Sequence, residues 1–91
     1  MTNPDTQIDF TATATLMKWP SLNGQRVPIA DGARPYTIIA STLDDCIQRF
    51  QSKAASQHHL YEIHTAAQGS VVTGVLSSSH IAELVRLREF L

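Results

Sequence analysis

The 91-residue sequence predicts an α+β fold, in which a small mixed or antiparallel β-sheet carries two helices packed on one face, in the order β-(β)-β-α-β-β-α. Three observations lead to this prediction. Apolar and polar residues alternate over 7–16 and 60–66, which is the period of a half-buried strand. Apolar residues recur at helical spacing over 43–54 and 81–91. Turn-forming residues separate several of these segments.

The first expected strand covers residues 7–16. Its apolar positions are Ile8, Phe10, Ala12, Ala14 and Leu16. Most of the polar residues between them are threonines, whose branching favours β structure. Residues 1–6 are polar and are expected to be a disordered tail. We therefore expect one α+β domain over residues 7–91, which is long enough to build one modest core.

Residues 17–34 are rich in turn and breaker signals. Asn23-Gly24 is typical of a two-residue hairpin turn and would join a short strand to a second one over 26–29. The proline inside that second segment would confine it to a sheet edge or a bulge. The alternative is an irregular loop of about 18 residues, a length that is uncommon in a compact domain unless the loop is functional or mobile. The sequence leaves both alternatives open.

A short strand is expected at residues 36–40, YTIIA, followed at once by a helix. Thr42 with Asp45 three residues later resembles a capping box, with Asp in place of the usual Glu, so the helix is expected to begin there. Its apolar stripe consists of Leu43, Cys46, Ile47, Phe50 and Ala54. We expect this helix to end near residue 56 or 57.

The C-terminal part predicts a hairpin, with strands over 60–66 and 71–76 and a turn at Gln68-Gly69. A loop of two or four residues would place Tyr61 opposite Leu76, whereas a one-residue change would exchange the two faces. The expected core positions are Tyr61, Ile63, Val72 and Leu76, and the expected outward positions are Glu62, His64, Thr73 and Val75.

The serine run 77–79 supplies capping oxygens for a second helix, which is expected to continue to Leu91. Its apolar stripe consists of Ile81, Leu84, Val85 and Leu91. Phe90 lies roughly opposite to Ile81, because successive residues turn by about 100°. A large aromatic residue off the main stripe is a candidate contact for a partner.

Composition narrows the classes of function. Charged residues make up only 16% of the chain, the net charge is −1, and the basic residues are scattered. We therefore expect no nucleic-acid partner, because such binding needs a basic patch or stripe. No apolar run is long enough to cross a membrane. The first residues lack the features of a signal peptide, so a cytoplasmic location is expected.

The conspicuous cluster of chemical side chains is His58, His59, Glu62 and His64. If residues 58–64 form a strand, Glu62 and His64 share a face with Cα atoms about 6.5–7 Å apart. These two residues are therefore the candidate metal ligands or acid–base pair. No second cluster of His, Cys or Asp completes the site, so a solvated strand face is the favoured interpretation and no cofactor is expected.

The remaining candidates are isolated residues. Cys46, the one cysteine, lies on an apolar helix stripe and is expected to be a buried thiol rather than a nucleophile. Trp19 is a candidate interaction residue or a plug at one end of the core. No set of nucleophile, base and orienting residue can be assembled, which argues against an enzyme.

The sequence therefore favours a small soluble non-catalytic protein that acts as a protein–protein interaction module. Its partner would be another protein or a second copy of the chain, with Phe90 and Trp19 as candidate contact residues. The alternative is a small metal- or ligand-binding protein that uses the His/Glu strand 58–64.

Overall fold

The computed structural model describes residues 8–68 and 72–90, except for the side chains of Glu89 and Phe90. The expected tail at 1–6 and the last residue, Leu91, lie outside the described residues. The strands are β1 (Thr13–Lys18), β2 (Ser21–Leu22), β3 (Gln25–Arg26), β4 (Tyr36–Thr42), β5 (Tyr61–Thr65) and β6 (Val75–Leu76). The helices are the α-helices α1 (Leu43–Gln51) and α2 (Ser78–Phe90) and the 3₁₀ helices η2 (Ile29–Asp31) and η3 (Ala55–Leu60).

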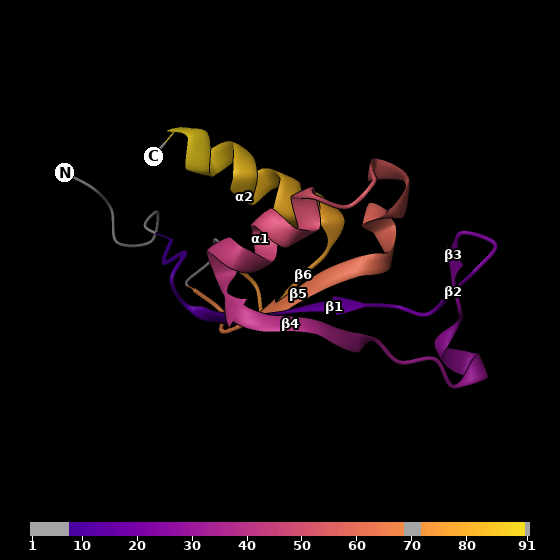
Figure 1. Ribbon diagram of the computed structural model, residues 1–91. Coiled ribbons are helices and arrows are strands. Elements are labelled where there is room, and N and C mark those ends of the chain that lie inside the picture. The colour runs from indigo at the N-terminus through magenta and orange to yellow at the C-terminus, as the bar shows by residue number, and fades with distance from the viewer. Residues whose placement is uncertain (1–7, 69–71, 91) are drawn as a thin grey trace.

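Four strands form an antiparallel sheet in the order β4-β1-β5-β6, and β2 with β3 forms a separate two-stranded sheet. Figure 1 shows α1 and α2 on the same side of the larger sheet, with the β2-β3 hairpin and η2 projecting beyond its end. The predicted α+β fold class is therefore confirmed, and so is the placement of both helices on one face.

The core lies between the sheet and the two helices. All four residues predicted to face the core from the C-terminal hairpin are buried, since none of them is more than 5% exposed. The buried cluster consists of Ala14, Leu16, Leu43, Cys46, Ile47, Phe50, Leu60, Tyr61, Ile63, Val72, Leu76, Ile81 and Leu84. Every strand of the larger sheet except β4 contributes at least one fully buried side chain.

The register of the C-terminal hairpin differs from the prediction by two residues. Ile63 lies opposite Leu76, whereas the sequence pattern placed Tyr61 there. The connection between β5 and β6 covers residues 66–74 and carries an isolated bridge between Gln68 and Val72. The predicted turn at Gln68-Gly69 lies partly outside the described residues. Because side chains alternate with a period of two, a shift of two residues keeps every side chain on its predicted face.

The first strand begins at Thr13 rather than at residue 7. The Asp9 carboxylate accepts hydrogen bonds from the amide (2.9 Å) and the hydroxyl (2.5 Å) of Thr11, which closes a local turn before β1. These bonds lower the pKa of the Asp9 carboxyl. Asp side chains favour turns in this way, so the alternating pattern over 8–12 did not produce a strand. Ile8 and Phe10 still pack against the core.

Helix α1 begins where predicted, because the Thr42 hydroxyl accepts a hydrogen bond from the Asp45 amide (3.1 Å). It ends at Gln51, earlier than the predicted residue 56 or 57. The Ser52 hydroxyl donates to the Arg49 carbonyl (2.6 Å) and so binds an acceptor of the last turn. Such side-chain bonds to the backbone compete with helix propagation, and the chain continues as η3 instead.

Residues 19–35 form a projecting arm that contains the β2-β3 hairpin and η2. The predicted turn at Asn23-Gly24 is present, with φ of 55° and 78°, which are the positive values that a type I′ turn requires. The hairpin alternative is therefore confirmed over the irregular loop. The second strand is shorter than expected, since β3 ends at Arg26 before Pro28.

The C-terminal end of α2 is tied to the start of α1. The Arg88 guanidinium forms an ion pair with Asp44 and lies 5.2 Å from the centre of the Phe10 ring. An Arg side chain inside an apolar stripe can pack its stem and still place its charge on a partner. This contact holds the two helices and the segment before β1 together.

Two leucines offer a matched test of where the core lies. Leu16→Ala is expected to lower the free energy of unfolding by about 2–5 kcal/mol, because Leu16 is fully buried. Leu22→Ala is expected to change it by less than about 0.5 kcal/mol, because Leu22 is 70% exposed. Urea unfolding followed by circular dichroism measures both values, and equal losses would contradict this placement of the core.

Candidate functional site

The face of the larger sheet that turns away from the helices carries two rows of side chains. One row runs across all four strands and consists of Ala40, Thr15, His64 and Val75. The neighbouring row consists of Thr37, Met17 and Glu62. The predicted candidates Glu62 and His64 therefore lie side by side on this open face, as the spacing of two residues indicated.

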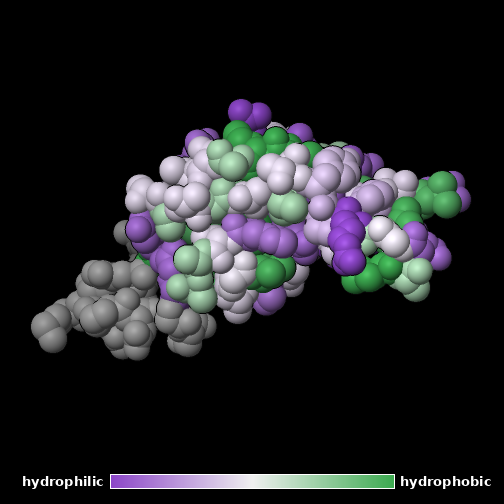
Figure 2. All heavy atoms as spheres, turned by 90° about the horizontal axis from the view of Figure 1, so that it is seen from below, coloured by the Kyte–Doolittle hydropathy of each residue, from purple (hydrophilic) through white to green (hydrophobic). Residues whose placement is uncertain are grey.

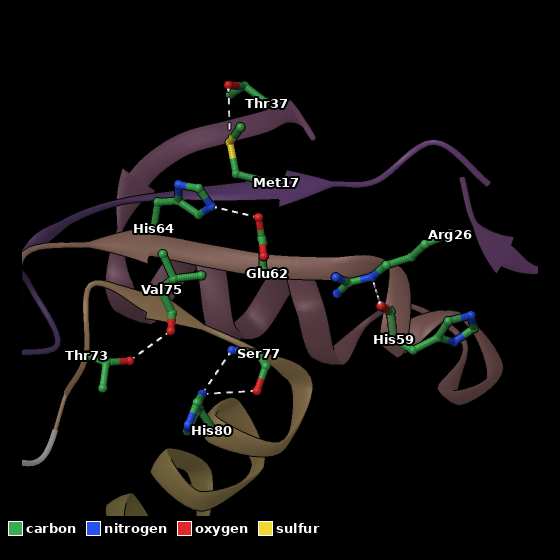
Figure 3. Close-up of polar contacts among 10 residues, drawn as sticks. All are labelled: Met17, Arg26, Thr37, His59, Glu62, His64, Thr73, Val75, Ser77 and His80. Atoms are coloured by element: carbon green, nitrogen blue, oxygen red, sulfur yellow. Dashed lines mark hydrogen bonds and ion pairs between the residues drawn. The ribbon is translucent and has the colours of Figure 1, made fainter. Parts of the chain in front are cut away.

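Glu62 and His64 are in direct contact. The His64 Nε2 donates a hydrogen bond to the Glu62 Oε1 at 2.8 Å, and Met17 lies beside the pair (Figure 3). The expectation that Glu62 is solvated is wrong, since this residue is only 9% exposed. A carboxylate can be buried when a partner satisfies it, and the half-buried imidazole supplies that partner here.

The other histidines do not join this pair. His58 and His59 belong to η3, so the predicted strand over 58–64 begins only at Tyr61. The His58 Nε2 donates to the Lys53 carbonyl (3.0 Å), and the His58 ring lies 4.2 Å from the Phe50 ring. The His59 Nε2 donates to the Gly24 carbonyl (2.6 Å). Each of these imidazoles therefore has a structural partner.

Glu62 and His64 can offer a metal ion two ligands. Within residues 8–68 and 72–90, no group of three or more His, Cys, Asp or Glu side chains is arranged to hold a metal ion. The pair can also exchange a proton. An acid–base pair alone does not catalyse a reaction, because it needs a positioned substrate or nucleophile.

The arm is fixed to η3 by polar contacts from Trp19 and from the β2-β3 hairpin. The Arg26 Nε donates to the His59 carbonyl at 2.6 Å, and Figure 3 shows this contact beside β5. The Arg26 guanidinium also lies 5.2 Å from the centre of the Trp19 ring. The Trp19 amide donates to the Leu60 carbonyl at 2.8 Å. The arm is therefore anchored to the domain both at its start and within the β2-β3 hairpin.

The structure describes the side chain of only one of the two predicted interaction residues, Trp19 and Phe90. Trp19 is half-buried beneath Arg26, and its indole N–H has no hydrogen-bond partner in the described part of the chain. Trp19 therefore packs against Arg26 and helps to hold the arm against the domain. Phe90 ends α2, and its side chain lies outside the described residues.

The arm and the start of β4 carry a group of exposed apolar side chains that the sequence pattern did not single out. The large apolar side chains that are exposed in the described residues are Leu22, Ile29, Tyr36, Ile38, Val75 and Leu87. The first four lie between residues 22 and 38, and we call these four the apolar strip. Figure 2 looks onto the open face and shows hydrophobic residues at the end that carries the arm, among hydrophilic ones, as well as elsewhere on this side. In the sequence, Leu22 and Ile29 stand among the turn signals of 17–34, whereas Tyr36 and Ile38 belong to the predicted strand 36–40.

Comparison with protein-family models, with curated protein sequences and with solved structures finds no match to this chain. Among the described residues, no helix is long and apolar enough to cross a membrane. The geometry of the chain itself is therefore the basis for any proposal about its function.

Cys46 behaves as predicted from its place on the apolar stripe. It is a free thiol in the core, with no exposed surface. Desolvation raises the pKa of this thiol, so less of the reactive thiolate is present at neutral pH. These properties do not suit a nucleophile.

We therefore expect Cys46 to react slowly with a thiol reagent such as Ellman's reagent while the chain is folded. In denaturant the reaction should become faster by about tenfold or more, because both the burial and the raised pKa are lost. Absorbance of the released chromophore measures both rates. Fast reaction of the native chain would show that the thiol is accessible.

Proposed function

We propose that this chain is a non-catalytic protein–protein interaction module that binds a protein partner through the apolar strip. The observation that carries the proposal is the gathering of Leu22, Ile29, Tyr36 and Ile38 within 17 consecutive residues, 22–38. Single exposed apolar residues are normal on a protein surface, whereas exposed apolar residues that gather in one region mark interaction sites.

The arm is ordered without contributing to the main core. None of the residues in the buried core cluster comes from 19–35. Ordering a residue costs about 1–2 kcal/mol of backbone entropy, which a segment normally regains through burial. Here the type I′ turn and the contacts to η3 hold the hairpin in place. A pre-formed apolar surface suits binding, because less entropy is lost when the partner arrives.

The low charge of the chain supports the same proposal. With a net charge of −1, long-range repulsion does little to oppose association with another protein. A cytoplasmic site of action is proposed with this function. The single cysteine is buried as a free thiol, which suits a reducing compartment.

Photo-crosslinking tests the strip directly. A benzophenone amino acid placed at position 22 or 29 is expected to form a covalent product with a protein partner in extract of the source cells. The same group at position 87 is expected to form none, since Leu87 is an exposed apolar residue of α2 outside the strip. Gel electrophoresis and mass spectrometry detect the product, and equal products from 22, 29 and 87 would contradict the proposal.

The double variant Leu22→Ser/Ile29→Ser is expected to lose the partner that is crosslinked through position 36. Its free energy of unfolding should change by no more than about 0.5 kcal/mol for each site, because both side chains are largely in solvent. Leu87→Ser serves as the matched control. Retention of the partner by the double variant would show that binding does not use the arm.

A second candidate function is metal or small-ligand binding at Glu62 and His64. The observation that favours it is the 2.8 Å contact of these side chains on a face that neither helix covers. Two protein ligands would leave the remaining coordination positions to water, which predicts weak binding. The interaction module is therefore the better-supported function.

If this second function holds, titration with Zn²⁺ or Ni²⁺ is expected to shift the NMR signals of the His64 ring. Glu62→Gln should weaken the response, because it removes the charged ligand. The His58 ring is an internal control, since its Nε2 is bound to the Lys53 carbonyl. Unmoved His64 signals would remove the metal version of this function.

A further inference from the structure

We propose that two copies of this chain pair through the outer edges of their β4 strands, which would join their two sheets into one continuous antiparallel sheet. The inference rests on the proposed function, because it names a second copy of the chain as one protein partner of the interaction module, bound next to the apolar strip. Tyr36 and Ile38 of that strip belong to β4 itself.

Strand β4 is an edge of the larger sheet. It pairs with β1 on one side, and no other strand among the described residues pairs with its outer side. Alternate residues of a strand direct their N–H and C=O groups to opposite sides, so about half of these groups in β4 point away from β1. Such a row of unpaired groups is a template for pairing with another chain.

The two edges of the sheet differ in how they are protected. At the other edge, β6 has only two residues, and a very short edge strand offers little template for pairing. Strand β4 has seven residues, Tyr36–Thr42, none of which is charged or proline. Charged residues and prolines are the usual protection of an edge strand, and β4 has neither.

One irregularity limits where pairing can occur. The register of β4 on β1 shifts at Leu16/Met17 and leaves Ile38 as an extra residue. A bulge disturbs the ladder locally. The regular part of β4 is Ile39–Thr42, and we assign the pairing to this part.

A second copy fits this edge by symmetry. A two-fold axis that relates two antiparallel edge strands is perpendicular to the sheet, so it places one residue opposite its own copy. With the axis at Ala40, Ile39 lies opposite Ser41 of the partner subunit, and Ala40 lies opposite the partner's Ala40. The side chains of Ala40 would stand side by side on the open face, and no like charges meet across the pair.

Position 40 therefore offers a charge-exchange experiment. Ala40 is exposed and lies on the open face, so a charged side chain fits there without disturbing the core. Ala40→Lys alone and Ala40→Glu alone would each place like charges opposite one another and weaken the dimer about tenfold or more. An equal mixture of the two variants would place opposite charges together and restore it.

Analytical ultracentrifugation over a micromolar concentration series measures the association. The wild type is expected to approach the mass of two chains, each variant alone the mass of one, and the mixture again the mass of two. Gln51→Lys is the matched control, because it adds the same charge at an exposed position of α1 and should associate like the wild type. Hydrogen exchange of the wild type should show protection that rises with concentration in β4, and this measurement needs no variant.

The outcomes separate this inference from the proposed function. A wild type that stays at the mass of one chain at every concentration overturns the pairing, and so does a dimer that Ala40→Lys leaves unchanged. Crosslinking from position 22 to a different protein would then still support the interaction module. Loss of both the dimer and the crosslinks would overturn both proposals.

Discussion

The structure depends on one row of aliphatic side chains that crosses the whole sheet beneath the helices. Leu16 lies opposite Ile39 on one side and Ile63 on the other, and Ile63 lies opposite Leu76. Three of these four side chains are fully buried or nearly so, and Ile39 packs against the same cluster. Burying this row fixes which face of every strand meets the helices. It thereby determines that His64 and its cross-strand neighbours line the open face.

This constraint explains how far the sequence predicts the fold. The pairing of the C-terminal hairpin was predicted two residues away from its true register, yet its four predicted core residues are all buried. Hydrophobic alternation identifies the face of a strand, whereas loop length sets the register, and the length of a loop is hard to read from composition. The predicted start of β1 and the predicted end of α1 were wrong for a different reason. Asp9 and Ser52 bond to nearby backbone groups, and these local bonds compete with the periodic pattern.

The candidate site was likewise predicted only in part. The proximity of Glu62 and His64 follows from a spacing of two residues on a strand, and the structure bears it out at 2.8 Å. The burial of Glu62 depends on neighbours from other strands, such as Met17, which a single sequence does not place. His58 and His59 were misplaced because a 3₁₀ helix, and not a strand, precedes Tyr61. In the apolar strip, Leu22 and Ile29 were missed because they lie in an aperiodic segment, and the predicted strand 36–40 did not show that Tyr36 and Ile38 would be exposed.

The arm and β4 carry exposed apolar residues, although the chain has only a single modest core in which to bury such residues. This arrangement needs a physical explanation. Residues 19–35 contribute nothing to the main buried cluster, yet they are held in a defined conformation by Arg26 and His59. Shortening this connection would relieve the chain of the entropy that ordering it costs. A long connection that is ordered, apolar and exposed is therefore best explained by contacts made outside the chain. The uncharged edge of β4 continues directly from this arm, so one partner can engage both the backbone of the strand and the side chains of the strip.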